Sequence, residues 1–486
     1  MERGFLAQCE QEPLHLSGAI QDHGTLLAVA ADGRVTHAAA NIGHFLGAPP
    51  QDWIGRPLPP ALAVHLQALP PEPGSRRALA GGVDGRDGAL DLCLNRGGDG
   101  ACVLEFTAHD PGLSAAPPTA TIIEPFADDR ALAATRRRLL QAISTHTAAR
   151  RVLYYAFLEQ GDGEVIDEVR QGEDLGSYLG LRFPASDIPQ IARALYLKNP
   201  WRLIVDARRE PVALLGHTAQ APDLTWSDLR SVSPVHRIYL ANMGVAGSLS
   251  LPVVSAGQLV ALITAHHHQA LQLAHGLLEA LADEVKAFAL ALTAYAAQCR
   301  MRMIDSLSRR FEAARAPLRR HGDLYAAWPE VAPLLLSEFQ ADGAMLCNHQ
   351  GASCVGRGLE PGVLERFDTW FGQRAGELVW TCDSLSRTVP DLPLTEIAGV
   401  LALRLDGATG HGLRIYLTRG EHIHEVAWGG NPDKPAEFHD GKLGIAPRRS
   451  FEKWVEKRLG YSRPWRNEDR LLALKLRELL LSEVRA

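Results

Sequence analysis

The sequence predicts an α+β protein of three mixed domains, each with a central antiparallel sheet, joined by a long connecting helix. The chain has 486 residues, and at about 150 residues per domain three domains are expected. Hydrophobic residues make up 46% of the chain and charged residues 22%, which is typical of folded globular proteins. Short apolar runs bounded by turn residues alternate with stretches at helical spacing, and this alternation indicates mixed domains.

Charge and motif content exclude several classes of function. A net charge of −6 gives no indication of nucleic-acid binding. No uncharged apolar run reaches the roughly 18 residues of a membrane span, and the N-terminus lacks the apolar stretch of a secretory signal. We therefore expect a cytoplasmic protein without nucleic-acid or membrane partners. The chain has no P-loop, Rossmann, GxSxG or HExxH motif, so we expect no enzyme activity within it.

The first predicted domain covers residues 1–118 and includes an N-terminal extension. Two apolar runs flank Asp32-Gly33, and this dipeptide is a strong hairpin signal. Short helices broken by prolines follow, and further strands end in the segment 102–110. The proline-containing stretch 111–118 is predicted to be a linker.

The second predicted domain covers residues 119–305. Apolar spacing predicts a helix over 129–147, and the apolar runs at 151–159 and 164–170 predict strands. A loop, a short helix and another strand follow. The segment 247–268 is predicted to form two strands around a glycine turn.

A long helix is predicted over 276–316, because the segment contains no proline and its apolar residues recur at helical spacing. Forty residues at a rise of about 1.5 Å would span about 60 Å, more than one small domain needs. The helix should therefore connect domains or line a dimer interface. The alternative is two helices with a break near Met301. One apolar stripe comprises Leu277, Leu281, Val285, Phe288 and Leu292.

The third predicted domain covers residues 306–486. It contains a hairpin-like excursion at 425–454, with Gly, Pro and Asp at its tip, and a final amphipathic helix over 467–484. This helix should pack against other elements, because it has too many leucines for a free surface helix. Its end at the chain terminus predicts a continuation in a longer parent protein. The leucines are Leu471, Leu474, Leu479 and Leu481.

Two polar segments are candidate sites. In the loop 182–189, prolines on both sides hold Asp187 in a stiff conformation. Asp187 could either face a ligand or cap the helix that follows, and the loop alone favours the cap. The triple histidine 266–268 does not predict a metal site, since successive strand residues point to opposite faces. We expect one inward histidine and one solvated histidine, and no metal site.

The cysteines indicate neither a disulfide framework nor a zinc ribbon. The chain has seven cysteines and no CxxC pair, so a disulfide framework or a zinc ribbon is not expected. Most of the cysteines are expected to be buried in a core. Cys9 is different, because it lies in the polar N-terminal stretch CEQEP. A terminal thiol of this kind is usually a solvated residue, and its role depends on its context.

Several motifs together resemble the bacteriophytochrome family. They are the segments 9–24, 182–189, 233–244, 428–430 and 447–451. The resemblance covers essentially the whole chain, with the motifs in one order. It implies a PAS domain, a GAF domain and a PHY domain, which form the photosensory core of that family. It also implies a red/far-red photoreceptor that binds biliverdin and switches between two photostates by isomerisation of the D-ring.

The resemblance implies a role for each pocket residue. Cys9 matches the cysteine that forms a thioether with the chromophore, and a soft thiol suits addition to a conjugated vinyl group. The carbonyl of Asp187 and the ring of His236 match groups beside the pyrrole nitrogens. His266 matches the histidine that faces the D-ring carbonyl. The remaining matches are the propionate partners Arg202, Arg230, Tyr196, Ser233, Ser248 and Ser250, the aromatic walls Tyr155, Phe183 and Tyr239, and Ile188 in the Asp187 loop.

The excursion at 425–454 matches the tongue of the PHY domain. The resemblance implies that Arg448 pairs with Asp187 in one photostate and that the tongue converts between hairpin and helix. The long helices would carry the change to an output module, in a protein that forms a homodimer through them. The tongue residues implied in signalling are Arg448, Ser450, Phe451, Trp454 and Glu456.

The sequence departs from the family pattern at two places. Asp22-His23-Gly24 stands where Pro-His-Gly is usual, and Thr264-Ala265 stands where a cysteine is frequent. Neither removes a pocket residue. A light-independent PAS/GAF sensor of another small ligand is the alternative function, because these folds host many ligands. A third hypothesis, catalysis by a Cys9–histidine pair, lacks the orienting residue that such a pair needs.

Overall fold

The computed structural model describes most of the chain. Side chains at 307–310, 424, 436–439, 442–445 and 458 are outside the description. The described residues are 12–113, 125–159, 161–172, 175–218, 220–348, 351–374, 376–405, 412–432, 436–439, 442–445 and 451–483.

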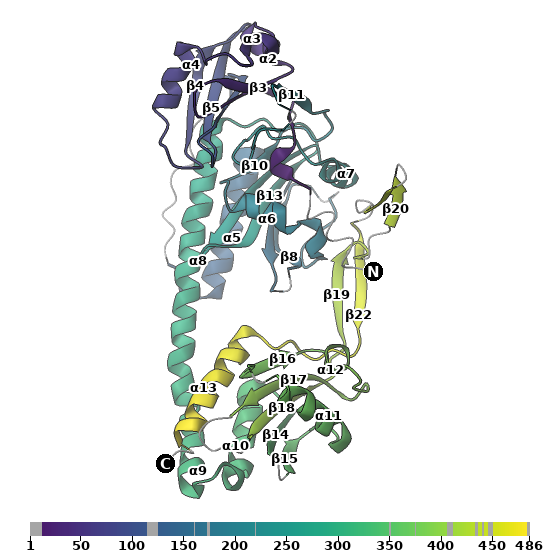
Figure 1. Ribbon diagram of the computed structural model, residues 1–486. Helices are drawn as coiled ribbons and strands as arrows, with labels where there is room; N and C mark the ends of the chain where they lie inside the picture. The colour runs from purple at the N-terminus through teal and green to yellow at the C-terminus, as the bar shows by residue number, and fades with distance from the viewer. Residues whose placement is uncertain are drawn as a thin grey trace. The chain divides into compact units, whose positions relative to one another are not determined.

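The chain forms two compact units, each with its own core (Figure 1). The first consists of the residues up to Tyr295 together with Ala427–Trp454, and the second of Ala296–Val426 with Val455–Ala486. Among the described residues, no helix combines the length and apolar character required to cross a bilayer.

The first sheet of unit one has seven strands in the order β1-β11-β3-β2-β6-β5-β4. The predicted hairpin at Asp32-Gly33 joins β2 to β3, with Gly33 at a φ of 83°. β11 comes from the middle of the chain and pairs with β1 and β3, so this sheet includes a segment far away in sequence. The strands are β1 Ala19–Ile20, β2 Gly24–Val29, β3 Val35–Ala39, β4 Arg76–Asp84, β5 Ala89–Arg96, β6 Cys102–Ala108 and β11 Val212–Gly216.

Short helices follow β3 and cover an apolar core against this sheet. Ile42, Leu58, Leu62 and Leu69 contribute to that core together with β2 and β6. The helices after β3 are α2 Ile42–Leu46, α3 Pro50–Trp53 and α4 Pro60–Gln67, and the short η1 Leu14–Leu16 precedes β1.

The second sheet of unit one has the strand order β10-β12-β13-β7-β8-β9-β19-β22. Its described pairs are antiparallel except β9 with β19, where Arg182 lies opposite Trp428. The strands are β7 Arg151–Phe157, β8 Gly163–Arg170, β9 Arg182–Phe183, β10 Arg202–Ile204, β12 Gly247–Ser255, β13 Gln258–His267, β19 His424–Gly429 and β22 Lys453–Arg458.

Helices pack against the second sheet and connect its strands. α5 begins as predicted, because the Asp128 carboxylate accepts a hydrogen bond from Ala131 N at 2.7 Å and caps the first turn. The helical elements are α5 Asp129–Thr147, η2 Ala185–Asp187, α6 Gln190–Tyr196 and α7 Pro234–Asn242.

The long helix α8 extends over His275–Arg310 and continues through Met301, so the alternative of a break there is wrong. It ends before the predicted residue 316, because Phe311 interrupts the helix and α9 starts at Glu312. Of the predicted stripe, Leu277, Leu281, Val285 and Phe288 are buried in the core of unit one, and Leu292 packs against that core.

Unit two is built on a five-stranded antiparallel sheet, β15-β14-β18-β17-β16. Its strands are β14 Gly343–Asn348, β15 Gly351–Gly356, β16 Val379–Cys382, β17 Ile397–Arg404 and β18 Arg414–Gly420. Its helices are α9 Glu312–His321, α10 Leu324–Phe339, α11 Pro361–Gly372, α12 Leu385–Thr388 and α13 Asn467–Glu483. These elements and those of unit one confirm the predicted α+β class with central antiparallel sheets.

The terminal helix α13 packs against unit two, but not with the predicted set of leucines. Leu479 is buried, whereas Leu471 and Leu474 are 41% and 38% exposed. The buried face consists of Leu472, Ala473, Leu476, Leu479 and Leu480. The choice between two leucine-rich faces depends on the sheet beneath the helix, which the helix sequence alone does not specify.

The excursion at 425–454 contains strands at both ends and a small hairpin between them. β20 Ala436–His439 pairs antiparallel with β21 Lys442–Ile445. Trp454 and Glu456 lie on β22, and Arg448 and Ser450 fall outside the described residues.

Candidate functional site

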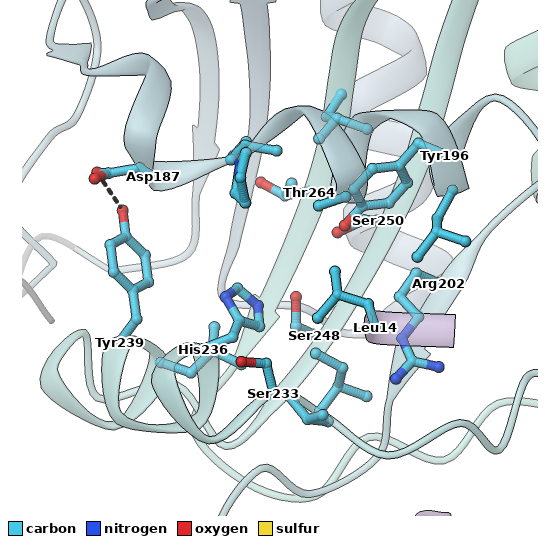
Figure 2. Close-up of a pocket in the computed structure, with 18 of the residues that line it drawn as sticks. Leu14, Asp187, Tyr196, Arg202, Ser233, His236, Tyr239, Ser248, Ser250 and Thr264 are labelled. Atoms are coloured by element: carbon cyan, nitrogen blue, oxygen red, sulfur yellow. Dashed lines mark hydrogen bonds between the residues drawn. The ribbon is translucent and has the colours of Figure 1, made fainter. Parts of the chain in front are cut away.

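A cavity in unit one lies on the second sheet and is bordered by the Asp187 loop, α6 and α7 (Figure 2). The cavity has a volume of about 240 Å³. The structure brings thirteen predicted site residues into its lining: Tyr155, Phe183, Asp187, Ile188, Tyr196, Arg202, Arg230, Ser233, His236, Tyr239, Ser248, Ser250 and His266.

The floor of the cavity is set by the register of neighbouring strands. Ser248 on β12 lies opposite Ile204 on β10 and His266 on β13, which forms one row across the sheet. Ser250 lies opposite Arg202 and Thr264, which forms the next row. Residues two apart on a strand share a face, so both rows point into the cavity.

The triple histidine contains one inward and one solvated residue, as predicted. His266 lines the cavity, whereas His268 is exposed and stacks on His267 with ring centroids 4.9 Å apart. The Nδ1 atom of His266 is buried without a hydrogen-bond partner among the described residues. Burial and the neighbouring Arg151 lower the pKa of His266 to about 3, so its ring is neutral at physiological pH.

Asp187 faces the cavity wall and does not cap a helix. α6 starts at Gln190 with Pro189 at the cap position and no side-chain cap, so the cap interpretation is wrong. The carboxylate of Asp187 instead accepts a hydrogen bond of 3.2 Å from the hydroxyl of Tyr239 (Figure 2). Arg193 holds the loop, since its Nε donates to Ile188 O at 2.8 Å.

His236 lies one turn from Tyr239 on α7, and their rings stack with centroids 6.0 Å apart. The accessible surface of His236 opens into the cavity (Figure 2). Separation from bulk water, reinforced by the positive charge of Arg202, lowers its pKa to about 4. The two histidines of the cavity are therefore neutral and offer one donor and one acceptor each.

Two arginines give the other end of the cavity a positive charge. Arg202 donates to Asp228 O at 3.0 Å and to Ser231 O at 3.2 Å, and Arg230 donates to Leu224 O and Thr225 O, both at 3.2 Å. Removal from water, together with the charge of Arg230, lowers the pKa of Arg202 to about 9. Guanidinium groups have five donors, more than these carbonyls occupy, so this end suits an anion.

Aromatic residues close the end of the cavity near Asp187. Tyr155 and Phe183 pack with centroids 5.9 Å apart, and Phe451 contacts Tyr239 at 5.0 Å. A side chain on Gly429 would collide with the ring of Phe183, because its Cβ would lie only 2.5 Å from the nearest ring carbon. Gly429 and Phe451 therefore lie against this wall. Arg448 and Ser450, predicted there as well, lie outside the described residues.

The sequence prediction missed several cavity residues. Glu12 lines the cavity and accepts a hydrogen bond of 2.9 Å from Ser233, and Thr264 lies between Leu262 and His266 on the same face of β13. Strand alternation from His266 would have identified Thr264. Tyr178 and Ser231 carried no such local signal. Cys9 lies outside the described residues.

Comparison with protein families identifies three regions in one order. Residues 9–73 match the PAS fold, residues 132–288 match the GAF domain, and residues 313–486 match the phytochrome region. This combination, with the cavity in the GAF region, defines a phytochrome-type photosensory core.

Individual relatives give a narrower assignment. A bacteriophytochrome from Pseudomonas aeruginosa is 32% identical over 97% of this chain, and cyanobacterial phytochrome B from Nostoc is 29% identical over 99%. The chain spans 66% of the length of each of these two relatives. It belongs to the bacteriophytochrome family.

Solved structures show the same fold over 98% of this chain. A bacteriophytochrome from the photosynthetic bacterium R. palustris matches with a TM-score of 0.77 and 27% identity, covering 98% of this chain and 99% of its own. The photosensory core module of the Stigmatella aurantiaca phytochrome matches with a TM-score of 0.79 and 27% identity, covering 98% and 97%.

Proposed function

We propose that this chain is the light-sensing part of a red/far-red photoreceptor and that its cavity holds biliverdin. The observation that carries the proposal is the division of one cavity into a cationic end and a neutral, aromatic end. Biliverdin has the corresponding division, with two propionates on a flat conjugated ring system. When bound, it supplies light absorption and a double bond whose isomerisation turns the D-ring.

The cationic end fits the propionates. Arg202 and Arg230 are two cations withdrawn from water. They lie close enough together that the charge of Arg230 disfavours the charged form of Arg202. A pair of carboxylates would offset that repulsion, and a guanidinium fork suits a carboxylate. Tyr196, Ser248 and Ser250 line the cavity and add hydroxyl groups that can donate to carboxylate oxygens.

The neutral end fits the rings and their nitrogens. Asp187 and His236 supply acceptors for ring N–H groups, and Tyr155, Phe183 and Tyr239 supply aromatic surface. The unpartnered Nδ1 of His266 can serve a ligand carbonyl as a donor if that atom bears the proton. These groups bind and orient the ring system and exclude water from it.

Cys9 is proposed to attach the chromophore through a thioether. Glu12 lies in the cavity wall, and three residues reach at most about 11 Å. Cys9 is therefore within reach of the cavity.

The segment around Phe451 is proposed to relay the change in the cavity. Phe451 packs on Tyr178 and Tyr239, so a movement of Tyr239 would be felt there directly. Arg448, Ser450, Trp454 and Glu456 would take part in the change of tongue structure. We further propose that an output module follows in a longer protein, which dimerises through its long helices.

The test is to co-express the chain with a heme oxygenase and to record absorption before and after red and far-red illumination. The proposal expects a red or far-red band that shifts reversibly with light. A protein that takes up no bilin, or a band that light does not change, would contradict it. The second result would favour the light-independent ligand sensor.

The attachment is tested separately with Cys9→Ser, and with Cys354→Ser as a control at an exposed cysteine of unit two. After denaturing electrophoresis, zinc-induced bilin fluorescence should be lost in Cys9→Ser and retained in the control. A fluorescent Cys9→Ser band would show that another residue forms the bond.

A further inference from the structure

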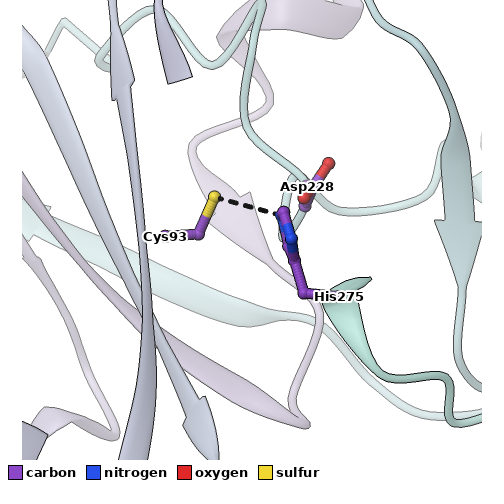
Figure 3. Close-up of side chains that lie close together, drawn as sticks. All are labelled: Cys93, Asp228 and His275. Carbon is purple, nitrogen blue, oxygen red and sulfur yellow. Dashed lines mark hydrogen bonds between the residues drawn. The ribbon is translucent and has the colours of Figure 1, made fainter. Parts of the chain in front are cut away.

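Three side chains with metal-binding atoms meet in unit one, outside the lining of the cavity (Figure 3). Cys93 is on β5, Asp228 is in the loop before α7, and His275 is the first residue of α8. One ligand atom of each lies within 4.8 Å of the other two. The three residues come from three separate parts of the chain, so the cluster is a product of the fold.

The spacing is close to that of a tetrahedral metal site. Zinc binds sulfur at about 2.3 Å and nitrogen at about 2.0–2.1 Å, which places the two ligand atoms about 3.6 Å apart. The Cys93 sulfur and His275 Nε2 are 3.8 Å apart. The ligand atoms of the three side chains lie up to 4.8 Å from one another. To bind a cation of this size, the most widely separated atoms must move about 1 Å closer together.

His275 faces Cys93 with one ring nitrogen and has a carboxylate near the other. Its Nε2 faces Cys93, and its other nitrogen, Nδ1, lies 3.5 Å from a carboxylate oxygen of Glu279, one helical turn onward. Nδ1 makes no hydrogen bond among the described residues, so Glu279 has to move closer to fix the tautomer that leaves a lone pair for the metal. Trp201 packs edge-on against the imidazole at 5.3 Å and limits its rotation.

The neighbouring Arg76 faces both Cys93 and Asp228, so a divalent cation has to displace it from the sulfur. It forms an ion pair with Oδ2 of Asp228 and lies over the Trp201 ring at 4.2 Å. A carboxylate has two oxygens, so Oδ1 can serve a cation while Oδ2 stays with Arg76. Asp228, Glu279 and a Cys93 thiolate together balance the charges of Arg76 and a divalent ion.

We propose that Cys93, Asp228 and His275 form a binding site for a zinc-like divalent cation. Mixed sulfur, nitrogen and oxygen ligands suit Zn²⁺, with water as the fourth ligand. Binding forms a metal–sulfur bond and releases the thiol proton to solvent. The ion would join the first sheet, the loop that carries Arg230 and the start of α8.

The test is to measure zinc bound to the purified, pigment-free full chain. After treatment with Zn²⁺ and gel filtration, the wild type should retain one more ion per chain than Cys93→Ala or His275→Ala, as measured by elemental analysis. Cys102→Ala, at a buried cysteine of the same sheet, and the double variant His267→Ala/His268→Ala should retain the wild-type amount. Equal zinc in the wild type and Cys93→Ala would overturn the proposal.

A second measurement identifies the ligand atom by spectroscopy instead of by the amount of metal bound. Co²⁺ added to the wild type should produce a sulfur-to-metal charge-transfer band in the near ultraviolet, and this band should be absent in Cys93→Ala. Glu279→Gln should keep the band but weaken metal affinity about tenfold, as expected for a carboxylate on the second imidazole nitrogen. A wild-type cobalt complex without the sulfur band would overturn the assignment of Cys93 as a ligand.

Discussion

His23 is a neutral, partly buried residue close enough to Arg202 to be affected by its charge. Desolvation, together with the charge of Arg202, lowers its pKa from 6.5 to about 4, although Asp22 acts in the opposite direction. Between these two pH values the unfolded imidazole binds a proton and the folded one does not. Stability should therefore fall as the pH decreases through this window.

We predict that His23→Gln makes the pigment-free chain less sensitive to acid. Between pH 7 and pH 5 the wild type should lose about 1–2 kcal/mol more unfolding free energy than the variant. Urea unfolding at the two pH values measures this difference. His146→Gln, at an exposed histidine, serves as the control and should behave as the wild type. The same pH dependence in His23→Gln and wild type would show that His23 does not titrate in this range.

Arg230 gives a second prediction, which depends on the proposed chromophore. Loss of a charge-assisted hydrogen bond costs about 1.5–3 kcal/mol, so Arg230→Gln should weaken biliverdin binding about 10- to 150-fold. Biliverdin dimethyl ester lacks the propionate charges, and its affinity should change far less. Titration of a chain that also carries Cys9→Ser measures both affinities without covalent trapping. An equal loss for both ligands would indicate that Arg230 acts through the structure of its loop.

At the scale of elements, one buried carboxylate joins the first sheet to the loop that carries Arg230. Glu105 on β6 is 2% exposed. Its oxygens accept hydrogen bonds from Leu229 N at 2.8 Å, from Asp228 N at 3.2 Å, from the Asn95 amide at 2.9 Å and from the Ser227 hydroxyl. All four partners donate, so the site is matched to an ionised carboxylate even though burial raises the pKa of Glu105.

Glu105→Gln should therefore destabilise unit one. The amide would direct N–H groups at donors, and unsatisfied buried groups cost about 1–3 kcal/mol. Chemical unfolding followed by tryptophan fluorescence measures the loss. Glu210→Gln is the matched control, since the Glu210 side chain is 84% exposed and pairs with Arg237 at the surface, and its unfolding midpoint should not move. An unchanged midpoint in Glu105→Gln would refute this account of the carboxylate.

Local patterns predicted elements more reliably than contacts between them. The Asp32-Gly33 hairpin and the helix capped by Asp128 were predictable because their signals lie within a few residues. The break at Phe311 was not, because the apolar spacing continues across it. The buried face of α13 was also not predictable, since two leucine-rich faces compete and the underlying sheet decides between them.

The candidate site shows the same limit. Motif resemblance singled out thirteen cavity residues, and strand alternation extends that set to Thr264. Cys93 and His275 are 182 residues apart and belong to no sequence motif, so only the fold reveals that they meet. The hydrogen bonds between Glu105 and the loop at 227–229 could not be predicted from the sequence either, because Glu105 and Ser227 are 122 residues apart.

At the scale of the whole molecule, the two units have separate apolar cores. The core of unit one includes Leu251 and Phe288, and that of unit two includes Trp328 and Phe367, all fully or almost fully buried. The cavity and the Cys93 cluster both belong to unit one. A ligand that binds only the folded form of one unit stabilises that unit by mass action.

We therefore predict two thermal transitions in calorimetry of the pigment-free chain, of which only one rises when the chromophore binds. Leu251→Ala should lower the responsive transition and Phe367→Ala the other, because a large-to-small change in a core costs about 2–5 kcal/mol. Each substitution thus serves as the control for the other. A single transition that both substitutions lower equally, and that the chromophore raises as a whole, would show that the two cores unfold as one cooperative unit.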